Sequence, residues 1–303
     1  MKPYILLILF ASLFMGACNL QQEIDLELPE YDAEYVVESY LQVGQPFFLT
    51  LTESQPYFDD VTISYLKGAD VTIEHKGEIF TLAEQTFRLD DPTLGAIGVD
   101  TGTLNILRPI LGDTVTFYLN INLVPESYNE DFNLNITLPN GEALSAKTQI
   151  LEPIPFDSLV FQQAANDTLS LLLSFFTDDG SQANFYRRVL EVREDQVISG
   201  SGDEEVTMRV TSVEQDFIAD DVVFNGQPFA FGTGFDFAIG DTVINTLYHM
   251  TFDHYRFVET RDAAIAASLS PFGQPAVIYS NIKGGLGIFA GISLDRQVTV
   301  REE

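Results

Sequence analysis

The chain has 303 residues, of which 15 are Lys or Arg and 45 are Asp or Glu, so its formal net charge is −30. A protein this acidic repels nucleic acid and anionic lipid headgroups, and we therefore exclude a nucleic-acid partner. The hydrophobic fraction of 46%, with 24 Phe and 12 Tyr, excludes a largely disordered chain, and the length suits two domains.

The N-terminus has the pattern of a bacterial lipoprotein signal. Residues 4–15 are almost wholly apolar but fall short of the about 20 residues that a membrane-spanning helix needs. Gly16-Ala17-Cys18 follows, and small residues before a cysteine predict cleavage and acylation at that cysteine. We predict a signal peptide at 1–17, lipidation of Cys18 and an acidic tether at 18–29. The alternative is an ordinary secretory signal with a chance cysteine.

The cysteine count supports the lipid anchor. Cys18 is the only cysteine of the chain, and a free thiol is a liability in an oxidising compartment, so a thiol consumed by lipid explains it better. Several acyl chains hold a protein on a membrane far more firmly than one chain does. The expected mature protein is therefore a globular body tethered to a membrane.

Residues 30–150 carry the pattern of short antiparallel strands. The clearest example is "ADVTIEHKGEIFTLAE", in which Val71 and Ile73 alternate with polar residues. Lys76-Gly77 predicts the turn to a returning strand, and Asn140-Gly141 predicts a second hairpin. These signals predict an Ig/fibronectin-like β-sandwich over 30–150.

Residues 151–303 are predicted to form a second β-rich domain. The boundary is placed at "LEPIPFDS", where Pro153 and Pro155 favour a stiff, extended connection. Further strand-like runs follow, and one main helix is predicted from Asp253 to Leu269. "PAVIYSNI" and "LGIFAGISLDRQVTV" are predicted as the last two β-like runs, joined by Lys283-Gly284-Gly285.

No motif in the sequence predicts a catalytic, cofactor-binding or metal-binding residue. Gly285-x-Gly287-x-x-Ala290 matches a dinucleotide fingerprint only formally, because β-like residues follow it, and its glycines better suit a tight turn or close strand approach. His249 and His254 lack the spacing of a zinc protease. The acidic doublets, such as Asp178-Asp179, are predicted to be solvated turns rather than calcium ligands.

One phenylalanine-rich stretch, "FNGQPFAFGTGFDF", predicts a partner surface in the second domain. Aromatic side chains on loops rich in glycine are typical of interfaces, and we assign Phe229, Phe231 and Phe235 to this surface. The alternative is that these rings, with Phe224 and Phe237, fill the second core.

Several stretches together resemble a Bacteroidota lipoprotein family, domain of unknown function 4249. They include "EIDLELPEYDAEYVVESYLQVGQPFFLTLTESQPYFDD", "KGADVTI", "PIPFDSL", "DDVVFNGQPFAF" and "PFGQPAVIYSNIKGGLGIFAG". Glu38-Ser39 departs from the Glu-Gly step expected there. The motif positions Tyr279, Asn281, Gly284, Gly285 and Gly287 are either structural or part of a partner surface.

The resemblance implies an outer-membrane lipoprotein, on the periplasmic or the cell-surface face, commonly encoded beside a TonB-dependent receptor. It implies no established activity and no catalytic residues. From this association we expect an accessory or ligand-capture partner of such a receptor. The rival interpretations are an envelope hydrolase acting on glycan or peptide, and a structural or adhesive surface protein.

Overall fold

The computed structural model describes residues 31–56, 62–96, 104, 107–163, 169–199, 205–234, 236–269, 274 and 276–302. The predicted signal peptide, Cys18 and the tether lie outside this part of the chain. Residues 33–303 group into one unit, to which the description below applies. Within the described ranges, no helix combines the length and the apolar character needed to cross a membrane.

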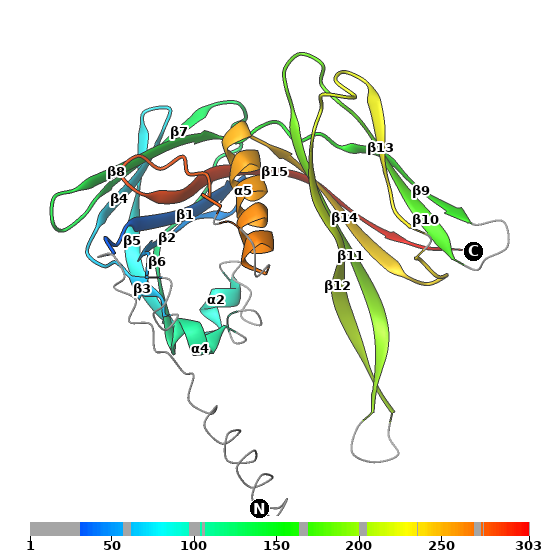
Figure 1. The fold of residues 1–303 in the computed structure, drawn as a ribbon, viewed down its shortest axis with the longest axis horizontal. Coiled ribbons are helices and arrows are strands. Elements are labelled where there is room, and N and C mark those ends of the chain that lie inside the picture. Colours follow the sequence, from blue (N-terminus) through cyan, green and yellow to red (C-terminus); the bar gives the residue numbers. More distant parts are fainter. Residues whose placement is uncertain are drawn as a thin grey trace, which may run out of the picture. The chain divides into compact units, whose positions relative to one another are not determined.

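Strands dominate the chain, as the sequence predicts, which confirms the all-β class (Figure 1). The strands before residue 151 are β1 (Tyr35–Gln42), β2 (Pro46–Glu53), β3 (Ser64–Tyr65), β4 (Asp70–His75), β5 (Glu78–Arg88), β6 (Thr114–Leu123), β7 (Asp131–Thr137) and β8 (Ala143–Gln149). Those after it are β9 (Phe156–Gln163), β10 (Ser170–Thr177), β11 (Phe185–Ser199), β12 (Glu205–Asp220), β13 (Pro228–Gly232), β14 (Thr242–Met250) and β15 (Leu286–Val300). The helices are α2 (Thr93–Ala96), α4 (Arg108–Leu111) and α5 (Phe252–Ser268).

One 12-stranded sheet runs through both halves of the chain, in the order β12-β11-β14-β15-β1-β2-β6-β5-β4-β7-β8, with β3 beside β2. The long strand β15 joins the halves. Its residues 286–292 pair in parallel with β1, and its residues 293–300 pair antiparallel with β14. The first and last strands of the fold are therefore neighbours (Figure 1).

The first half closes around a main apolar core, with a smaller cluster beside it. Alternate residues of β1, β2, β4, β7 and β8 point inward, so that Val37, Leu49, Ile73 and Phe132 are fully buried together. Phe289 of β15 belongs to the same cluster. The strand segments fold over one another in a sandwich-like arrangement, which is what the alternating sequence pattern predicts.

The second half forms its core between β11, β12 and β14 on one side and a three-stranded sheet, β13-β10-β9, on the other. Phe176 and Tyr186 are fully buried in this core, and so is the guanidinium of Arg188. On the side of α5, Phe252 and Tyr255 of that helix pack against the ring of Phe185 of β11 in tilted arrangements. The separate core clusters of the two halves favour a domain boundary near residue 150, whereas β15 pairs with strands of both halves and argues against one. The boundary between 150 and 151 therefore stays a prediction.

Local turn and cap signals explain the elements that the sequence predicts best. Lys76 and Gly77 both adopt positive φ in the β4–β5 turn, as a two-residue hairpin turn requires. Asn140-Gly141 likewise lies between β7 and β8. The helix begins one residue before the predicted Asp253 because the Thr251 side chain is the N-cap, accepting from the backbone N–H of His254.

The stretch "PAVIYSNI" was expected to be strand-like, and this expectation is wrong for its described residues 276–282. Its backbone groups bond to side chains instead of to a neighbouring strand. The Tyr279 N–H donates to the Thr260 hydroxyl of α5 at 2.8 Å, and the Ile282 N–H donates to Ser280 at 3.1 Å. β-propensity alone does not reveal such side-chain partners.

Candidate functional site: a polar groove beside the 279–283 segment

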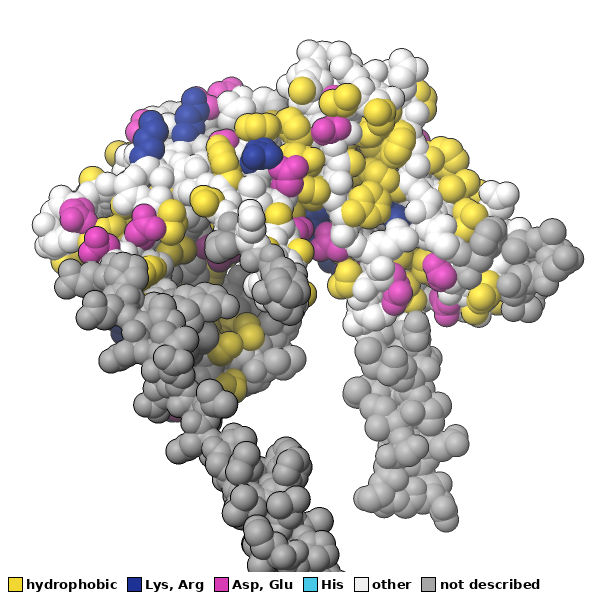
Figure 2. All heavy atoms as spheres, in the orientation of Figure 1, with side chains coloured by type: hydrophobic (Ala, Val, Ile, Leu, Met, Phe, Trp, Pro, Cys, Tyr) yellow, Lys and Arg dark blue, Asp and Glu magenta, His cyan; other side chains and the backbone are white. Residues whose placement is uncertain are grey.

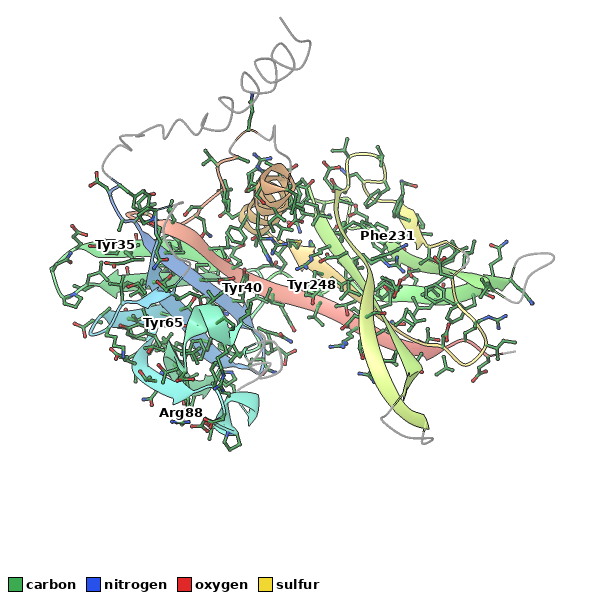
Figure 3. The ribbon with its side chains drawn as sticks, turned by 60° about the horizontal axis from the view of Figure 1, so that its bottom comes forward. Tyr35, Tyr40, Tyr65, Arg88, Phe231 and Tyr248 are labelled. Atoms are coloured by element: carbon green, nitrogen blue, oxygen red, sulfur yellow. The ribbon has the colours of Figure 1, made fainter. Side chains whose placement is uncertain are left out.

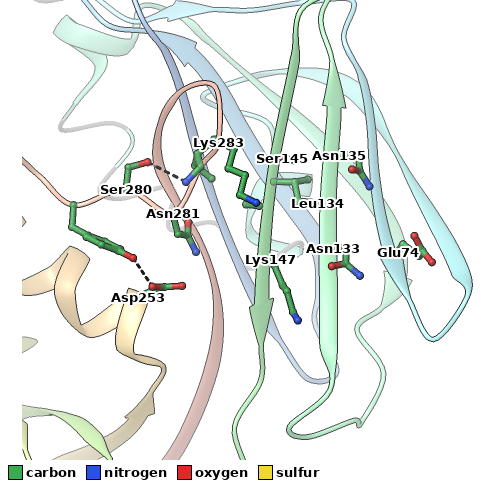
Figure 4. Close-up of a pocket in the computed structure, with 13 residues that line it drawn as sticks. Glu74, Asn133, Leu134, Asn135, Ser145, Lys147, Asp253, Ser280, Asn281 and Lys283 are labelled. Carbon is green, nitrogen blue, oxygen red and sulfur yellow. Dashed lines mark hydrogen bonds between the residues drawn. The ribbon is translucent and has the colours of Figure 1, made fainter.

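A cavity of about 720 Å³ lies against the outer face of β4, β7 and β8 (Figure 4). We call it the polar groove. Residues alternate along each strand, so Leu134 and Ala146 point into the core while their neighbours point outward. Two cross-strand rows result. Glu74, Asn133 and Lys147 form one row, and Asn135 and Ser145 lie side by side in the next.

The opposite wall of the polar groove is the segment Tyr279–Lys283. It is fastened to β8 by two backbone hydrogen bonds, from the Ser145 N–H to the Lys283 carbonyl at 3.1 Å and from the Lys283 N–H to the Ser145 carbonyl at 2.8 Å. The Asn281 amide clamps the segment to β15, donating to the Phe289 carbonyl and accepting from the Phe289 N–H. The wall is therefore preformed.

Helix α5 closes one end of the polar groove with Asp253 in its first turn. The Tyr279 hydroxyl donates to the Asp253 carboxylate at 2.5 Å (Figure 4). This hydrogen bond, assisted by burial, raises the pKa of Tyr279 to about 12. The tyrosine therefore stays a neutral donor at physiological pH, and the pair fixes the helix end against the segment.

The polar groove balances its charges within an acidic protein. Its lining holds two lysines, Lys147 and Lys283, and two carboxylates, Glu74 and Asp253, and the Lys147 ammonium also pairs with Asp131 at 2.6 Å. Lys and Arg side chains are few on the face drawn in Figure 2. A lining of amides, hydroxyls and matched charges offers hydrogen bonds in both directions, which suits an uncharged or zwitterionic polar ligand.

The glycines of the motif bring backbones together, which is the structural alternative given above. A Cβ on Gly287, whose φ is +108°, would lie 1.9 Å from the Val37 carbonyl oxygen of β1. A Cβ on Gly285 would lie 2.6 Å from the Tyr35 carbonyl, and one on Gly284 would lie 2.9 Å from the Ala143 carbonyl. Only glycine permits this close approach of β15 to its neighbours.

Ser39 stands where the family resemblance predicts glycine. Its side chain is fully buried, and its hydroxyl donates to the Phe48 carbonyl of β2 at 2.7 Å. The extra polar atom is therefore satisfied within the core, and the departure leaves the strand pairing intact.

Two of the three phenylalanines assigned to a partner surface, Phe229 and Phe231, pack against other rings of the second half. Phe231 is 5% exposed and stacks on Phe176, and Phe229 is half-buried and stacks on Phe224. Phe224 and Phe237 are also buried. Phe224, Phe231 and Phe237 therefore fill cores of the second half, the alternative weighed above, while Phe229 packs against one of these cores and keeps partial exposure. Phe235 lies outside the described residues.

The histidines do not form a metal pair. His249 contacts the Glu152 carbonyl and the Asn184 side chain, whereas His254 packs against the Tyr40 ring. Burial lowers the pKa of both, and that of His254 falls to about 4. No group of three or more His, Cys, Asp or Glu side chains that could hold a metal ion occurs within the described residues.

Two acidic doublets, Asp178-Asp179 and Asp220-Asp221, differ from the predicted solvated turns because each has one buried member. Asp178 is 5% exposed and accepts hydrogen bonds from the Tyr186 hydroxyl at 2.5 Å, the Asn184 amide at 3.1 Å and the Gly226 N–H at 2.6 Å. Asp221 is also buried and accepts from the Asn184 N–H. These carboxylates organise loops of the second half, because three donors compensate a buried charge. Sequence alone does not distinguish such a carboxylate from an exposed one.

A family model described as Domain of unknown function (DUF4249) covers residues 21–297, which include both walls of the polar groove. No curated protein matches the chain.

Proposed function

The chain belongs to the family described as Domain of unknown function (DUF4249). From this premise we propose that the protein is an outer-membrane lipoprotein that assists a TonB-dependent receptor. It does so by capturing a polar ligand for the receptor or by docking onto the receptor. The observation that carries ligand capture is the polar groove. Its size is that of small-molecule sites, and its walls come from a rigid sheet and a clamped segment.

The chemistry of the polar groove favours binding a polar ligand. The amides of Asn133 and Asn135 project from one strand, and the lining also carries two ammonium groups, Lys147 and Lys283, and two carboxylates, Glu74 and Asp253. Such a lining recognises hydroxyls, amides or a zwitterion through several hydrogen bonds. A tethered protein needs only modest affinity for its receptor, because anchoring in the same membrane raises the effective concentration.

The anchor is tested by Cys18→Ala with fatty-acid labelling and membrane fractionation. We expect the wild type to incorporate the label and to fractionate with the outer membrane, and the variant to be released. A variant that stays in the outer membrane, together with an unlabelled wild type, would overturn the localisation.

The partner is tested by purifying the tagged full chain from detergent-solubilised outer membrane and identifying co-purifying proteins by mass spectrometry. We expect a TonB-dependent receptor. Bound small molecules are analysed in the same sample, with the Asn133→Ala/Asn135→Ala variant compared with Thr137→Ala, an exposed residue of the same strand. A bound polar molecule should be lost only from the first variant.

The possible outcomes separate the rival functions. A preparation with no receptor under any condition argues against the accessory role and favours an envelope hydrolase, which glycan and peptide substrates would then test. Binding of fixed glycan surfaces without receptor or soluble ligand would favour an adhesive protein.

A further inference from the structure

A second cavity, of about 580 Å³, lies on the outer face of β1 and β2 and shares no lining residue with the polar groove. We call it the aromatic groove. Glu38, Tyr40 and Gln42 alternate along the outer face of β1, and Phe48 and Thr50 do so on β2. Glu38 lies opposite Thr50 in the strand register. Figure 3 shows Tyr40 at the middle of this sheet region.

The aromatic groove has structural cover on two sides. On one side, His254 of α5 packs against the Tyr40 ring, with centroids 5.7 Å apart. On the other, Phe117 of β6 packs against Phe48 at 4.4 Å and belongs to a small cluster with Leu89 and Leu94. This second cover explains why residues 115–119 of β6 are all buried rather than alternating. The cavity lies between these two covers.

Among the described lining residues, Glu38 alone carries a formal charge. The Tyr40 hydroxyl donates to Glu38 Oε1 at 2.9 Å, so the carboxylate and the ring are held next to one another. Burial raises the pKa of Tyr40, and the positive charges of Arg187 and Arg261, which lie outside the lining, act in the opposite direction. Each is paired with its own carboxylate, Asp216 and Asp262 respectively, so neither neutralises Glu38.

These features select one class of ligand. Anions are repelled by Glu38 and by the net charge of −30. A neutral apolar molecule would desolvate the Glu38 carboxylate without giving it a partner, which is unfavourable. An organic cation satisfies the carboxylate and places its apolar substituents against the faces of Tyr40 and Phe48, where aromatic rings attract positive charge.

We propose that the aromatic groove is a binding site for an organic cation, an ammonium or guanidinium group with apolar substituents, held by Glu38 and the rings of Tyr40 and Phe48. The inference does not depend on the proposed function, since it concerns a different cavity. Lysine and arginine side chains of a peptide and free quaternary amines share this chemistry.

The test compares choline with 3,3-dimethyl-1-butanol, a neutral molecule of nearly the same shape, on the full chain in detergent. Titration calorimetry is done at constant ionic strength, with sodium chloride replacing choline chloride. We expect saturable choline binding and at least tenfold weaker binding of the neutral analogue. Equal affinity for the two, or no binding of choline, would overturn the proposal.

Variants then assign the site. Glu38→Gln removes the charge at an exposed position and should weaken choline at least tenfold, whereas Glu74→Gln in the polar groove is the matched control and should leave affinity unchanged. Tyr40→Phe keeps the ring and should retain binding, and Tyr40→Leu should weaken it about fivefold or more. Unchanged thermal unfolding of Glu38→Gln confirms an intact fold. Equal effects of Glu38→Gln and Glu74→Gln would show non-specific charge attraction and overturn the assignment.

Discussion

The two halves of the chain fill their interiors differently. The first half buries a nearly continuous apolar cluster, with His75 and a few hydroxyls as its polar members. The second half buries Arg188, Asp178, Asp221 and His249 among its aromatic rings. Arg188 has only neutral partners among the bonds described, those of Asn245, Gln215 and Ser174, and burial lowers its pKa to about 10.

This difference predicts how substitutions in each half change the free energy of unfolding. An apolar core loses free energy in proportion to the side-chain volume that is removed, whatever the pH. A buried polar network loses most when one partner is removed, because the other partners are left unsatisfied, and it responds to protonation. We therefore expect the two halves to differ in pH dependence more than in size of effect.

The strongest test concerns the strand that both halves share. Gly287→Ala places a Cβ against the Val37 carbonyl at a position with φ of +108°, so β1 and β15 must separate. We expect a loss of about 4 kcal/mol or more in the free energy of unfolding, measured by urea denaturation. Gly95→Ala, which meets nothing within 4 Å, is the control. A small loss at Gly287 would mean that the halves do not depend on this pairing.

Leu49→Ala tests the apolar half. Leu49 is fully buried in the first core, so its truncation leaves a cavity. The expected loss is about 3 to 5 kcal/mol, with the same value at pH 5 and pH 8. A loss that changes strongly with pH would show that the first core is not dominated by apolar packing.

His254 of α5, which packs against Tyr40 of β1, tests the pH response of a buried histidine from the second half of the chain. Burial, with Arg187 and Arg261 nearby, lowers its pKa from 6.5 to about 4. Between these values the unfolded chain binds a proton that the folded chain does not. The free energy of unfolding is therefore highest above pH 6.5 and falls by about 3 kcal/mol as the pH drops toward 4. His254→Phe keeps a ring against Tyr40 and should remove most of this loss in urea titrations across that range. His249, whose pKa burial also lowers, should leave a residual slope. An unchanged slope in the variant would exclude His254 as its source.

Asp178→Asn tests the buried carboxylate. The amide nitrogen must face at least one of the three donors now bound by Asp178, and we expect a loss of about 2 kcal/mol. The neighbouring Asp179→Asn is the control, since Asp179 is exposed and its change should stay within about 0.5 kcal/mol. Equal losses at the two positions would contradict a network centred on Asp178.

Lys147→Ala should have the smallest effect. Its ion pair with Asp131 lies on the outer face of the first half, with the lysine side chain 59% exposed. Exposed pairs contribute little, and the unfolding free energy should change by less than about 0.5 kcal/mol. A larger loss in the same urea assay would mean that the polar groove is part of the stability of the first half rather than a surface free for binding.

Local signals made much of the fold predictable. The pair Lys76-Gly77 predicts a turn because glycine readily adopts the positive φ that a two-residue hairpin turn needs. The start of the helix is marked by Thr251, whose side chain caps it, and by Asp253 in its first turn. The all-β class follows from such segments. By contrast, the pairing of β1 with β15 depends on residues about 250 positions apart, and no local pattern contains that register.

The candidate site was predictable only in part. Tyr279 and Asn281 were singled out through the family resemblance, and they line the polar groove. Asn133, Asn135 and Lys147 were missed, since polar residues on alternating strand positions are typical of any solvated face. The alternation does predict which side they occupy. The sequence does not show that the segment Tyr279–Lys283 lies over this outer face, because that contact joins residues far apart in the chain.

The shared strand β15 also constrains the order in which the fold is completed. As the polypeptide emerges from its N-terminus, β1 is among the first strands to appear, yet its parallel neighbour at residues 286–292 is among the last. Until then, one edge of β1 has open N–H and C=O groups that could pair with another molecule. A nascent chain of this kind stays vulnerable to aggregation until synthesis is nearly finished, and it benefits from chaperones that shield that edge.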